Sequence, residues 1–387
     1  MHNGFCCRGH LSCFRYNRSH RLRLLEAGCR RSTRALRLMP KILALSTAIP
    51  PHRMDQAFAR REMARLCEGQ PHLERLIPVF DRTGVDTRHL VHEPEWYLES
   101  RSFEARNEEY AAKALELSQK AVRSCLAQSG TTPDEIDHIF VVTTTGLTTP
   151  SLDALLASCL GLRADVRRSP LFGLGCAGGA GALIRACDVL SSRPGDKALV
   201  VSVELGSLIF SKQAQTATDL VGVALFGDGA AAALLGGDDT DGPGIRIAHT
   251  RTHLFKDSRH LMGWRFTGDG MRLVLSRDIP SLVGSRVAPV VQDFLKDAGL
   301  SFANIRHHIL HPGGAKVMST YRSAFGLSDD ALSTARECMR QFGNLSSAAV
   351  LVMLSNLVAS GAPQSGDNGL MLALGPGFAA EMLAIVW

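Results

Sequence analysis

Three residues have the side-chain types that acyl transfer requires, and the first is a cysteine in a glycine-rich turn. Cys176 lies in the run GLGCAGGA at 173–180, and a helix-like segment follows it. A cysteine at the positive end of a helix is expected to have a lowered pKa. The glycines would let backbone N–H groups and a substrate carbonyl approach the sulfur. The alternative is a buried, inert cysteine that only packs beside the turn.

The other two residues are a histidine and an asparagine. His311 ends an apolar strand in HHILHPGG at 307–314, where proline and two glycines expose it. Asn344 stands in FGNLSS at 342–347, directly before an apolar helix. Taken singly, the histidine would be an ordinary polar residue and the asparagine a helix N-cap. Together with Cys176 they form a set suited to acyl transfer, with a nucleophile, a proton partner and hydrogen-bond donors for a thioester oxygen.

Alternating buried strands and helices must position these residues. Because the strands are continuous runs of Val, Ile, Leu and Ala, they indicate sheets that are covered on both faces. Each half of the chain has a strand, a glycine turn and a helix with a reactive side chain. We therefore predict an α/β fold in which a duplicated unit forms a five-layered αβαβα sandwich, with an N-terminal half at 39–240 and a C-terminal half at 241–387. Strands are predicted at 41–46, 136–143, 197–203, 225–235, 244–249, 307–310, 369–374 and 380–386, and helices at 54–68, 102–128, 151–160, 176–190, 278–298, 315–325, 329–340 and 346–358.

Composition excludes several classes of protein. The chain has 387 residues, 45% of them hydrophobic, which is enough for one large core or two domain-sized units. Residues 1–38 contain nine Arg and one Glu, a local charge of +8 within a total of +6, so the remainder carries −2. Such a near-neutral body argues against nucleic-acid binding. No apolar run reaches the roughly 18–20 residues that span a bilayer, so no integral membrane segment is expected.

The basic N-terminal extension, 1–38, is left out of the fold prediction. Its composition is also that of transit peptides. We interpret it as a disordered arm or, since a strand follows Met39 almost at once, as an artefact of the assigned start. The ten cysteines show no metal-ligand spacing, which favours free thiols and a cytoplasmic location.

Five motifs occur in the order and spacing found in one known family. From about residue 40 to the C-terminus the sequence resembles type III polyketide synthases, the chalcone synthase-like family of the thiolase superfamily. Within the family it looks most like bacterial alkylpyrone and alkylresorcinol synthases, at 95–97, 102–104, 173–176, 262–264 and 276–280. The five motifs are GCAGG at 175–179, LFGDGA at 225–230, HPGG at 311–314, GNLSS at 343–347 and GPG at 375–377.

The resemblance implies a thiolase-like fold and a role for each member of the Cys/His/Asn set. Cys176 would carry the acyl group. His311 would hold it as a thiolate and, with Asn344, bind the thioester oxygen and stabilise the enolate left when malonyl-CoA loses CO₂. The substrates would be malonyl-CoA and an acyl-CoA, with no metal and no bound cofactor.

The resemblance also implies which residues shape the cavity. Phe226 would be the aromatic gatekeeper between the CoA tunnel and the cavity. Leu273 stands at the second gatekeeper position, which is aromatic in plant enzymes, and Gly206 stands where plant enzymes often have threonine. Both differences remove bulk, so they favour a long aliphatic starter over a coumaroyl one. Other cavity positions fall on Thr144, Thr145 and Ser346, and Trp264 would shape the floor of the acyl tunnel.

CoA binding and cyclisation are assigned in the same way. Arg75 and Arg82 lie near the basic segment that binds CoA phosphates. Gly313, Gly314 and Ala315 match the backbone that contacts the pantetheine arm. The cyclisation loop would be Gly375, Pro376 and Gly377, although the first glycine of the family's GFGPG pattern is Ala373 here. The family forms homodimers, which would bury the apolar region 148–156.

The expected activity is therefore that of a type III polyketide synthase, an acyltransferase. It would load a long-chain fatty acyl group onto Cys176, extend it with a few malonyl-CoA units and release an alkylpyrone. The alternatives are an alkylresorcinol-forming synthase, a single-extension enzyme of the ketosynthase III type that needs acyl carrier protein, and a catalytically silent thiolase-fold binding protein. The sequence leaves the chain length and the number of extensions open.

Overall fold

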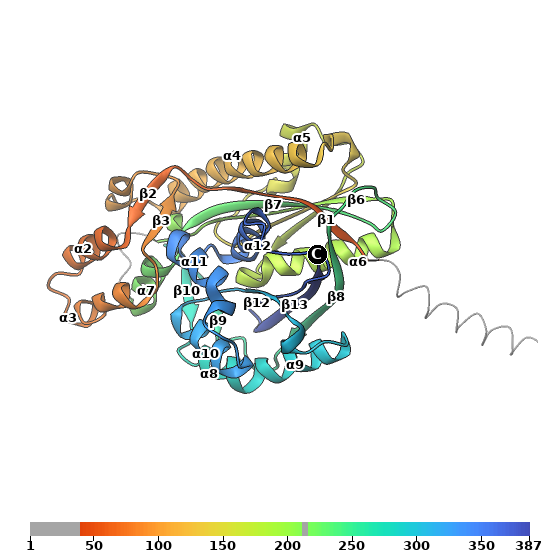
Figure 1. Cartoon of the computed structure of the whole chain (residues 1–387). Coiled ribbons are helices and arrows are strands. Elements are labelled where there is room, and N and C mark those ends of the chain that lie inside the picture. Colours follow the sequence, from red (N-terminus) through yellow and green to blue (C-terminus); the bar gives the residue numbers. More distant parts are fainter. Residues whose placement is uncertain (1–38, 211–215) are drawn as a thin grey trace, which may run out of the picture. The chain divides into compact units, whose positions relative to one another are not determined.

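Five layers of helix and sheet are stacked in the computed structural model, which describes residues 39–210 and 216–387 (Figure 1). The interpretation of 1–38 falls outside the described residues. From one outer face to the other, the layers are α4 and α5, a first sheet, α6 and α12, a second sheet, and α8 to α10. The predicted five-layered fold class is confirmed.

The strands follow the order β11-β12-β13-β8-β1-β7-β6-β4-β5. The two sheets meet at β1 and β8, which pair through only two residue pairs, Lys41 with Arg246 and Ile42 with Ile245. The first sheet contains β1 Lys41–Ala48, β4 His138–Thr143, β5 Arg167–Phe172, β6 Lys197–Leu205 and β7 Asp228–Gly236. The second contains β8 Ile245–Leu254, β11 His307–Leu310, β12 Asn368–Gly375 and β13 Ala379–Val386. Two antiparallel strand pairs form separate two-stranded sheets. They are β2 His52–Asp55 with β3 Thr87–Leu90, and β9 Met262–Thr267 with β10 Gly270–Leu275.

The helices fill the space between and around the sheets. Long amphipathic α4 begins at its N-cap Ser102, whose side chain accepts a hydrogen bond from Ala105 N, and ends at left-handed Gly130. The α-helices are α2 Gln56–Leu66, α3 Pro71–Glu74, α4 Phe103–Ser129, α5 Leu152–Leu160, α6 Gly178–Ser192, α7 Ala217–Leu225, α8 Ile279–Leu282, α9 Ala288–Asp297, α10 Ala315–Phe325, α11 Ser333–Phe342 and α12 Ala349–Ala359. Short 3₁₀ segments used below are η1 Ile77–Arg82, η2 Pro94–Leu98, η4 Gly175–Ala177, η5 Gly206–Leu208 and η9 Ser346–Ala348.

Central helices α6 and α12 touch both sheets, so their ends are fixed from two sides. Glycine lets the start of α6 approach η9. A Cβ at Gly179 would lie 2.1 Å from Ser347 O, and one at Gly178 would lie 2.4 Å from a methyl carbon of Val142. These glycines therefore allow the cysteine-bearing and asparagine-bearing segments to pack closely.

The structure corrects the sequence-based elements in several places, and β2, β3, β5 and α3 were not predicted at all. The run predicted as a strand at 225–235 begins as the last residue of α7, and β7 starts only at Asp228. A capping box of Thr216 and Asp219 starts α7, which the strand prediction missed. The helix predicted at 278–298 is interrupted by a π-turn at Val283–Val287. The β9–β10 hairpin was not predicted, and the expected boundary at 240 and 241 lies in the loop between β7 and β8.

Candidate active site

Cys176 lies in η4, directly before α6, with its side chain buried. Its sulfur is 3.7 Å from the Ser346 hydroxyl oxygen. Gly175 has a φ of +50°, and a Cβ there would lie 2.4 Å from Pro376 Cδ, so both conformation and space require glycine. The turn that holds the cysteine therefore packs against the GPG loop.

Asn344 is fixed by its backbone and by its side-chain oxygen. Its N–H donates to Leu225 O at 2.8 Å, and its carbonyl accepts from Gly227 N at 3.2 Å. Its Oδ1 accepts from Ser346 N at 2.8 Å. The N-cap role considered for this residue is wrong, because the N-cap positions of η9 and α12 are Leu345 and Ala348; Asn344 Oδ1 instead closes a local turn with Ser346 N. This bond also sets the orientation of the amide and leaves Nδ2 as a donor for another group.

His311 follows β11, and its N–H donates to Leu372 O of β12 at 2.8 Å. The residue is 3% exposed, and neither ring nitrogen has a hydrogen-bond partner among the described residues. A buried imidazole with both nitrogens free is unusual, since buried polar atoms are nearly always paired. Its nitrogens are available to a ligand or a reacting group.

Two strand ends bring the three residues to one place. β12 pairs with β11, the strand that ends directly before His311. The last residue of β12, Gly375, packs against the cysteine turn. A Cβ at Gly375 would lie 2.3 Å from Leu174 O. On the other side, a Cβ at Gly314 would lie 4.0 Å from Leu225 Cδ2, and Leu225 is the residue whose carbonyl binds Asn344 N.

Burial controls the charges of the nucleophile and the imidazole. It raises the pKa of the Cys176 thiol to about 12, although hydrogen bonds from Ser346 and Asn344 act in the opposite direction. It lowers the pKa of His311 to about 4. The expectation that the helix N-terminus lowers the Cys176 pKa is therefore wrong, because desolvation of the thiolate outweighs local dipoles. Burial thus disfavours an isolated thiolate and an isolated imidazolium alike.

Glu204, near the end of β6, is a site residue that the sequence analysis missed. It is fully buried, and burial raises the pKa of its carboxyl to about 7. Its carboxyl accepts from Thr144 N at 3.1 Å, from Thr144 Oγ1 at 3.2 Å and from Ser347 Oγ. The predicted cavity residue Thr145 accepts from Leu205 N at 2.9 Å. The sequence signal that could have identified Glu204 was a single carboxylate in an otherwise apolar strand.

The predicted gatekeeper residues lie together. Phe226 forms an isolated bridge with Asn344. A Cβ at Gly206 would lie 2.9 Å from Phe226 Cβ, so any larger residue would press on this ring. The rings of Phe226 and Phe210 are 6.2 Å apart, and Phe210 is a further member that the sequence analysis did not identify.

The β9–β10 hairpin adds the other two predicted residues to this group. A Cβ at Gly222 would lie 2.2 Å from Phe210 Cζ and 3.3 Å from Leu273 Cδ2, so Leu273 and Phe210 are close. Leu273 is directly opposite Trp264 in the hairpin. The hairpin thus places Leu273 close to Phe210, with Trp264 across the hairpin from Leu273.

The residues predicted to bind CoA remain predictions. Gly313 and Gly314 have positive φ and precede α10, which begins at Ala315. Arg75 caps α3 and Arg82 ends η1, both exposed, and within 39–210 and 216–387 neither side chain forms an ion pair. Among the described residues, no group of three or more His, Cys, Asp or Glu could hold a metal ion, and no helix could cross a membrane.

The five-layered fold, with a cysteine at the head of its central helix, defines the thiolase-like class. Family models of chalcone and stilbene synthases match the chain, the N-terminal domain at 26–239 and the C-terminal domain at 246–386. The chain therefore belongs to the chalcone and stilbene synthase family. It is a type III polyketide synthase, an enzyme of the acyltransferase class.

Similar proteins are bacterial members of this family. A putative chalcone synthase of Bacillus subtilis is 38% identical over 362 residues, which cover 90% of this chain and 99% of the relative. A 1,3,6,8-tetrahydroxynaphthalene synthase of Streptomyces peucetius is 39% identical over 351 residues, which cover 89% and 93%. The crystal structure of 1,3,6,8-tetrahydroxynaphthalene synthase from Streptomyces coelicolor has a TM-score of 0.86 at 28% identity, and the match covers 90% of this chain and 99% of that one.

Proposed function

We propose that this type III polyketide synthase loads a long-chain fatty acyl group from acyl-CoA, extends it with malonyl-CoA and releases an alkylpyrone. The observation that carries the starter class is the low bulk around Phe226. Gly206 has no side chain beside that ring, and Leu273 replaces an aromatic residue. The reduced bulk beside Phe226 favours a flexible alkyl chain over a planar aromatic starter.

In the loading step, Cys176 Sγ attacks the thioester carbon of acyl-CoA. The Sγ–C bond forms as the C–S bond to CoA breaks, and the thiol proton passes through His311 to the departing CoA sulfur. Asn344 Nδ2 and the imidazole donate to the carbonyl oxygen while it carries negative charge. The two ring nitrogens of His311 suit these roles, because no group of the described residues 39–210 and 216–387 bonds to them.

In the extension step, malonyl-CoA loses CO₂ and the electron pair of the broken C–C bond becomes an enolate. His311 and Asn344 again face a developing oxyanion, so no carboxylate base is needed. The enolate carbon attacks the acyl carbonyl and Cys176 leaves as the thiolate. A thiolate in this buried site is costly, and that cost ends when the sulfur takes up a proton from solvent through His311 or attacks the thioester of the newly formed β-ketoacyl-CoA.

Product analysis tests the proposal. Purified protein is incubated with malonyl-CoA and a panel of acyl-CoAs from butanoyl to eicosanoyl, and products are identified by mass spectrometry. We expect alkylpyrones without added acyl carrier protein. CO₂ release without any pyrone or resorcinol would refute the proposed product. Dependence on acyl carrier protein would indicate the ketosynthase III alternative. Alkylresorcinols as products would show that the enzyme is an alkylresorcinol-forming synthase. A tetrahydroxynaphthalene product, as in the names of two relatives, would refute the alkyl starter.

Replacement of the nucleophile tests the mechanism. Cys176→Ala should abolish loading and condensation. The matched control is Cys187→Ala, which replaces a buried cysteine within α6. Full condensation activity in the first variant would show that the mechanism is wrong. If wild type and both variants were inactive, the catalytically silent alternative would be supported.

A smaller change tests the starter class. Gly206→Ala places a methyl group 2.9 Å from Phe226 Cβ, so we expect kcat/KM for long chains to fall about ten-fold. Gly195→Ala is the control, because a Cβ there meets no atom within 4 Å. Equal chain preference in the two variants would contradict the role of Gly206.

We also propose a cytoplasmic homodimer. Leu147 and Phe172 lie near the apolar region 148–156 and are 40% and 45% exposed, which suits a covered face. The six described cysteines are all free, as in a reducing compartment. Sedimentation analysis of wild type and Phe172→Glu tests the dimer, which the charged residue should weaken, and a monomeric wild type would refute it.

A further inference from the structure

Arg106 is a buried arginine of α4 that has no role in the mechanism above. Only 5% of the residue is exposed, and it lies in the first turns of the helix, just after the N-cap Ser102. Arginine is almost never buried unless its side chain is paired, because the guanidinium carries a charge and five N–H donors. The groups that accept hydrogen bonds from Arg106 therefore show what it holds in place.

The hydrogen bonds of Arg106 join three segments that are far apart in the sequence. Its Nη1 donates to Leu208 O at 3.2 Å and to Ile209 O at 2.5 Å, at the end of η5. Its Nη2 donates to Asp269 O at 3.0 Å, in the turn of the β9–β10 hairpin. Its Nε donates to Ser102 O at 3.4 Å within α4. One planar guanidinium thus links η5, the hairpin turn and the start of α4.

The hairpin depends on side-chain contacts for its position. In the part of the chain that the structure describes, β9 and β10 pair only with each other and lie apart from the nine-stranded sheet (Figure 1). Gly270 lets the hairpin turn approach α4, because its φ is +121° and a Cβ there would lie 2.8 Å from Phe103 Cδ2 and 3.5 Å from Arg106 Nη2. Arg272 adds a link from the hairpin to α7, through Asp219 at 3.1 Å. Arg106 supplies a direct link from the hairpin to η5.

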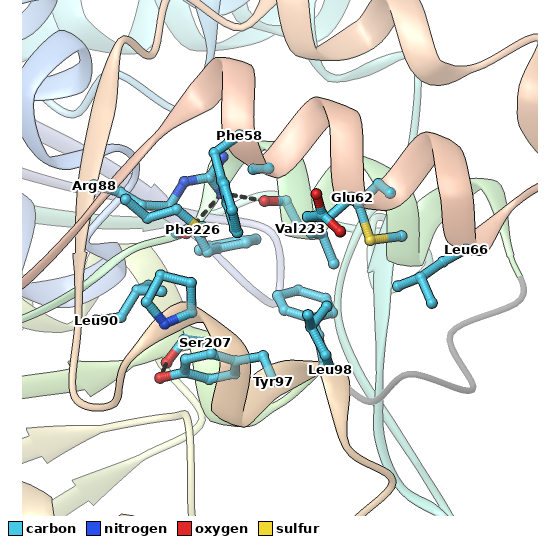
Figure 2. A pocket seen from close by; sticks show the side chains of 15 residues that line it. Phe58, Glu62, Leu66, Arg88, Leu90, Tyr97, Leu98, Ser207, Val223 and Phe226 are labelled. Carbon is cyan, nitrogen blue, oxygen red and sulfur yellow. Dashed lines mark hydrogen bonds between the residues drawn. The ribbon is translucent and has the colours of Figure 1, made fainter.

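The two segments that Arg106 joins carry the residues on which the proposed starter class rests. Segment η5 begins with Gly206, which leaves room beside Phe226. Ser207 of η5 and Phe226 both line a cavity of about 100 Å³ between α2, β3, η2 and the end of α7 (Figure 2). The hairpin carries Leu273, which lies close to Phe210 of the same cavity wall. A shift of the hairpin relative to η5 would therefore move Leu273 with respect to Gly206 and Phe226.

We propose that Arg106 is a positioning residue for starter selection, because it fixes the distance between η5 and the β9–β10 hairpin. This inference rests on the proposed function, in which Gly206 and Leu273 favour a long alkyl chain. Arg106 acts through three backbone carbonyls, so its effect on the acyl chain is indirect. Without the guanidinium these carbonyls lose their donor, and the hairpin moves away from η5 so that water can satisfy them. The wider gap then discriminates less between chain lengths.

Arg106→Met tests this role, since it removes the donors and keeps an unbranched side chain. We measure the ratio of kcat/KM for dodecanoyl-CoA over kcat/KM for butanoyl-CoA, and expect it to fall about ten-fold. This ratio does not depend on the fraction of enzyme that is folded, so a loss of stability alone leaves it unchanged. The matched control is Arg123→Met, also on α4, whose Nη2 donates to Cys159 O of α5 at 3.2 Å and should keep the wild-type ratio.

A second variant moves the hairpin while Arg106 stays in place. In Gly270→Ala the new methyl group presses on Phe103, so the turn is pushed away from α4 and the ratio should fall in the same direction. Gly268→Ala is its control, because a Cβ there meets no atom within 4 Å. Hydrogen exchange of the hairpin, 262–275, gives a readout without substrate. We expect it to be about ten-fold faster in Arg106→Met and unchanged in Arg123→Met.

The outcomes separate the role of Arg106 from the proposed function. If wild type uses no fatty acyl-CoA, the proposed function fails and starter selection by Arg106 falls with it. If wild type uses dodecanoyl-CoA and hairpin exchange in Arg106→Met is unchanged, Arg106 does not hold the hairpin and the proposal is overturned. Faster exchange with a wild-type ratio in both variants leaves Arg106 a structural role only, which also overturns it. Should Arg106→Met not fold, an unchanged ratio in Gly270→Ala contradicts the proposal.

Discussion

The buried histidines predict a measurable sensitivity to acid. Burial lowers the pKa of His311 to about 4 from an ordinary value of 6.5. The folded protein then binds fewer protons than the unfolded chain between these values. The contribution of this group to stability is complete above pH 6.5 and is lost as the pH falls toward 4. Between pH 7.5 and 5.0 the loss is about 2 kcal/mol, a large part of the stability of an ordinary domain.

His311→Gln removes the titrating ring and keeps a polar side chain of similar size. We expect the difference in free energy of unfolding between wild type and variant to change by about 2 kcal/mol from pH 7.5 to 5.0, in favour of the variant at low pH. Burial also lowers the pKa of His308 to about 4, so a replacement of His308 should give a similar change. The assay is urea unfolding at both pH values, followed by tryptophan fluorescence.

The comparison with the variant is needed because two buried carboxyls titrate in the opposite sense. Burial raises the pKa of Glu204 to about 7 and that of Asp228 to about 6, so their ionisation reduces stability as the pH rises. Exposed His260→Gln is the matched control and should leave the difference constant. If His311→Gln and wild type lose stability in parallel, the reasoning from burial is refuted.

Three further results are expected. Gly375→Ala should reduce condensation at least about ten-fold, because its Cβ would lie 2.3 Å from Leu174 O and displace the cysteine turn; wild-type kinetics would contradict this. Arg88→Met should lower the free energy of unfolding by about 3 kcal/mol, because the carbonyls of Val223 and Phe226 lose their hydrogen-bond donor. A change within experimental error would show that these carbonyls find another donor. Iodoacetamide should modify exposed Cys159 before buried Cys176, by peptide mass analysis, and the reverse order would mean that the resting nucleophile is already a thiolate.

Much of the fold could be predicted because the signals were local. Continuous aliphatic runs gave the central strands, and glycine or proline beside Cys176 and His311 gave their places at the ends of elements. Asn344 was correctly placed shortly before a helix, but its side-chain oxygen closes a turn with Ser346 N and does not cap the helix.

The remainder depends on contacts between distant segments. Helix α7, Ala217–Leu225, was not predicted, and the strand prediction began one element too early at Leu225. The pKa of Cys176 was predicted with the wrong sign because burial is a tertiary property, whereas the helix end is visible in the sequence. Glu204 and Phe210 became site residues only through partners from other elements.

The central layer has a consequence for how such enzymes diversify. Helices α6 and α12 are enclosed by both sheets, and the chain enters each of them through the reactive segment. Substitutions there are coupled to two sheets at once, so this machinery is difficult to alter. The cavity wall, by contrast, comes from α2, η2 and short connections at the periphery. New starter specificities can therefore evolve by exchanging outer side chains while the catalytic centre stays constant.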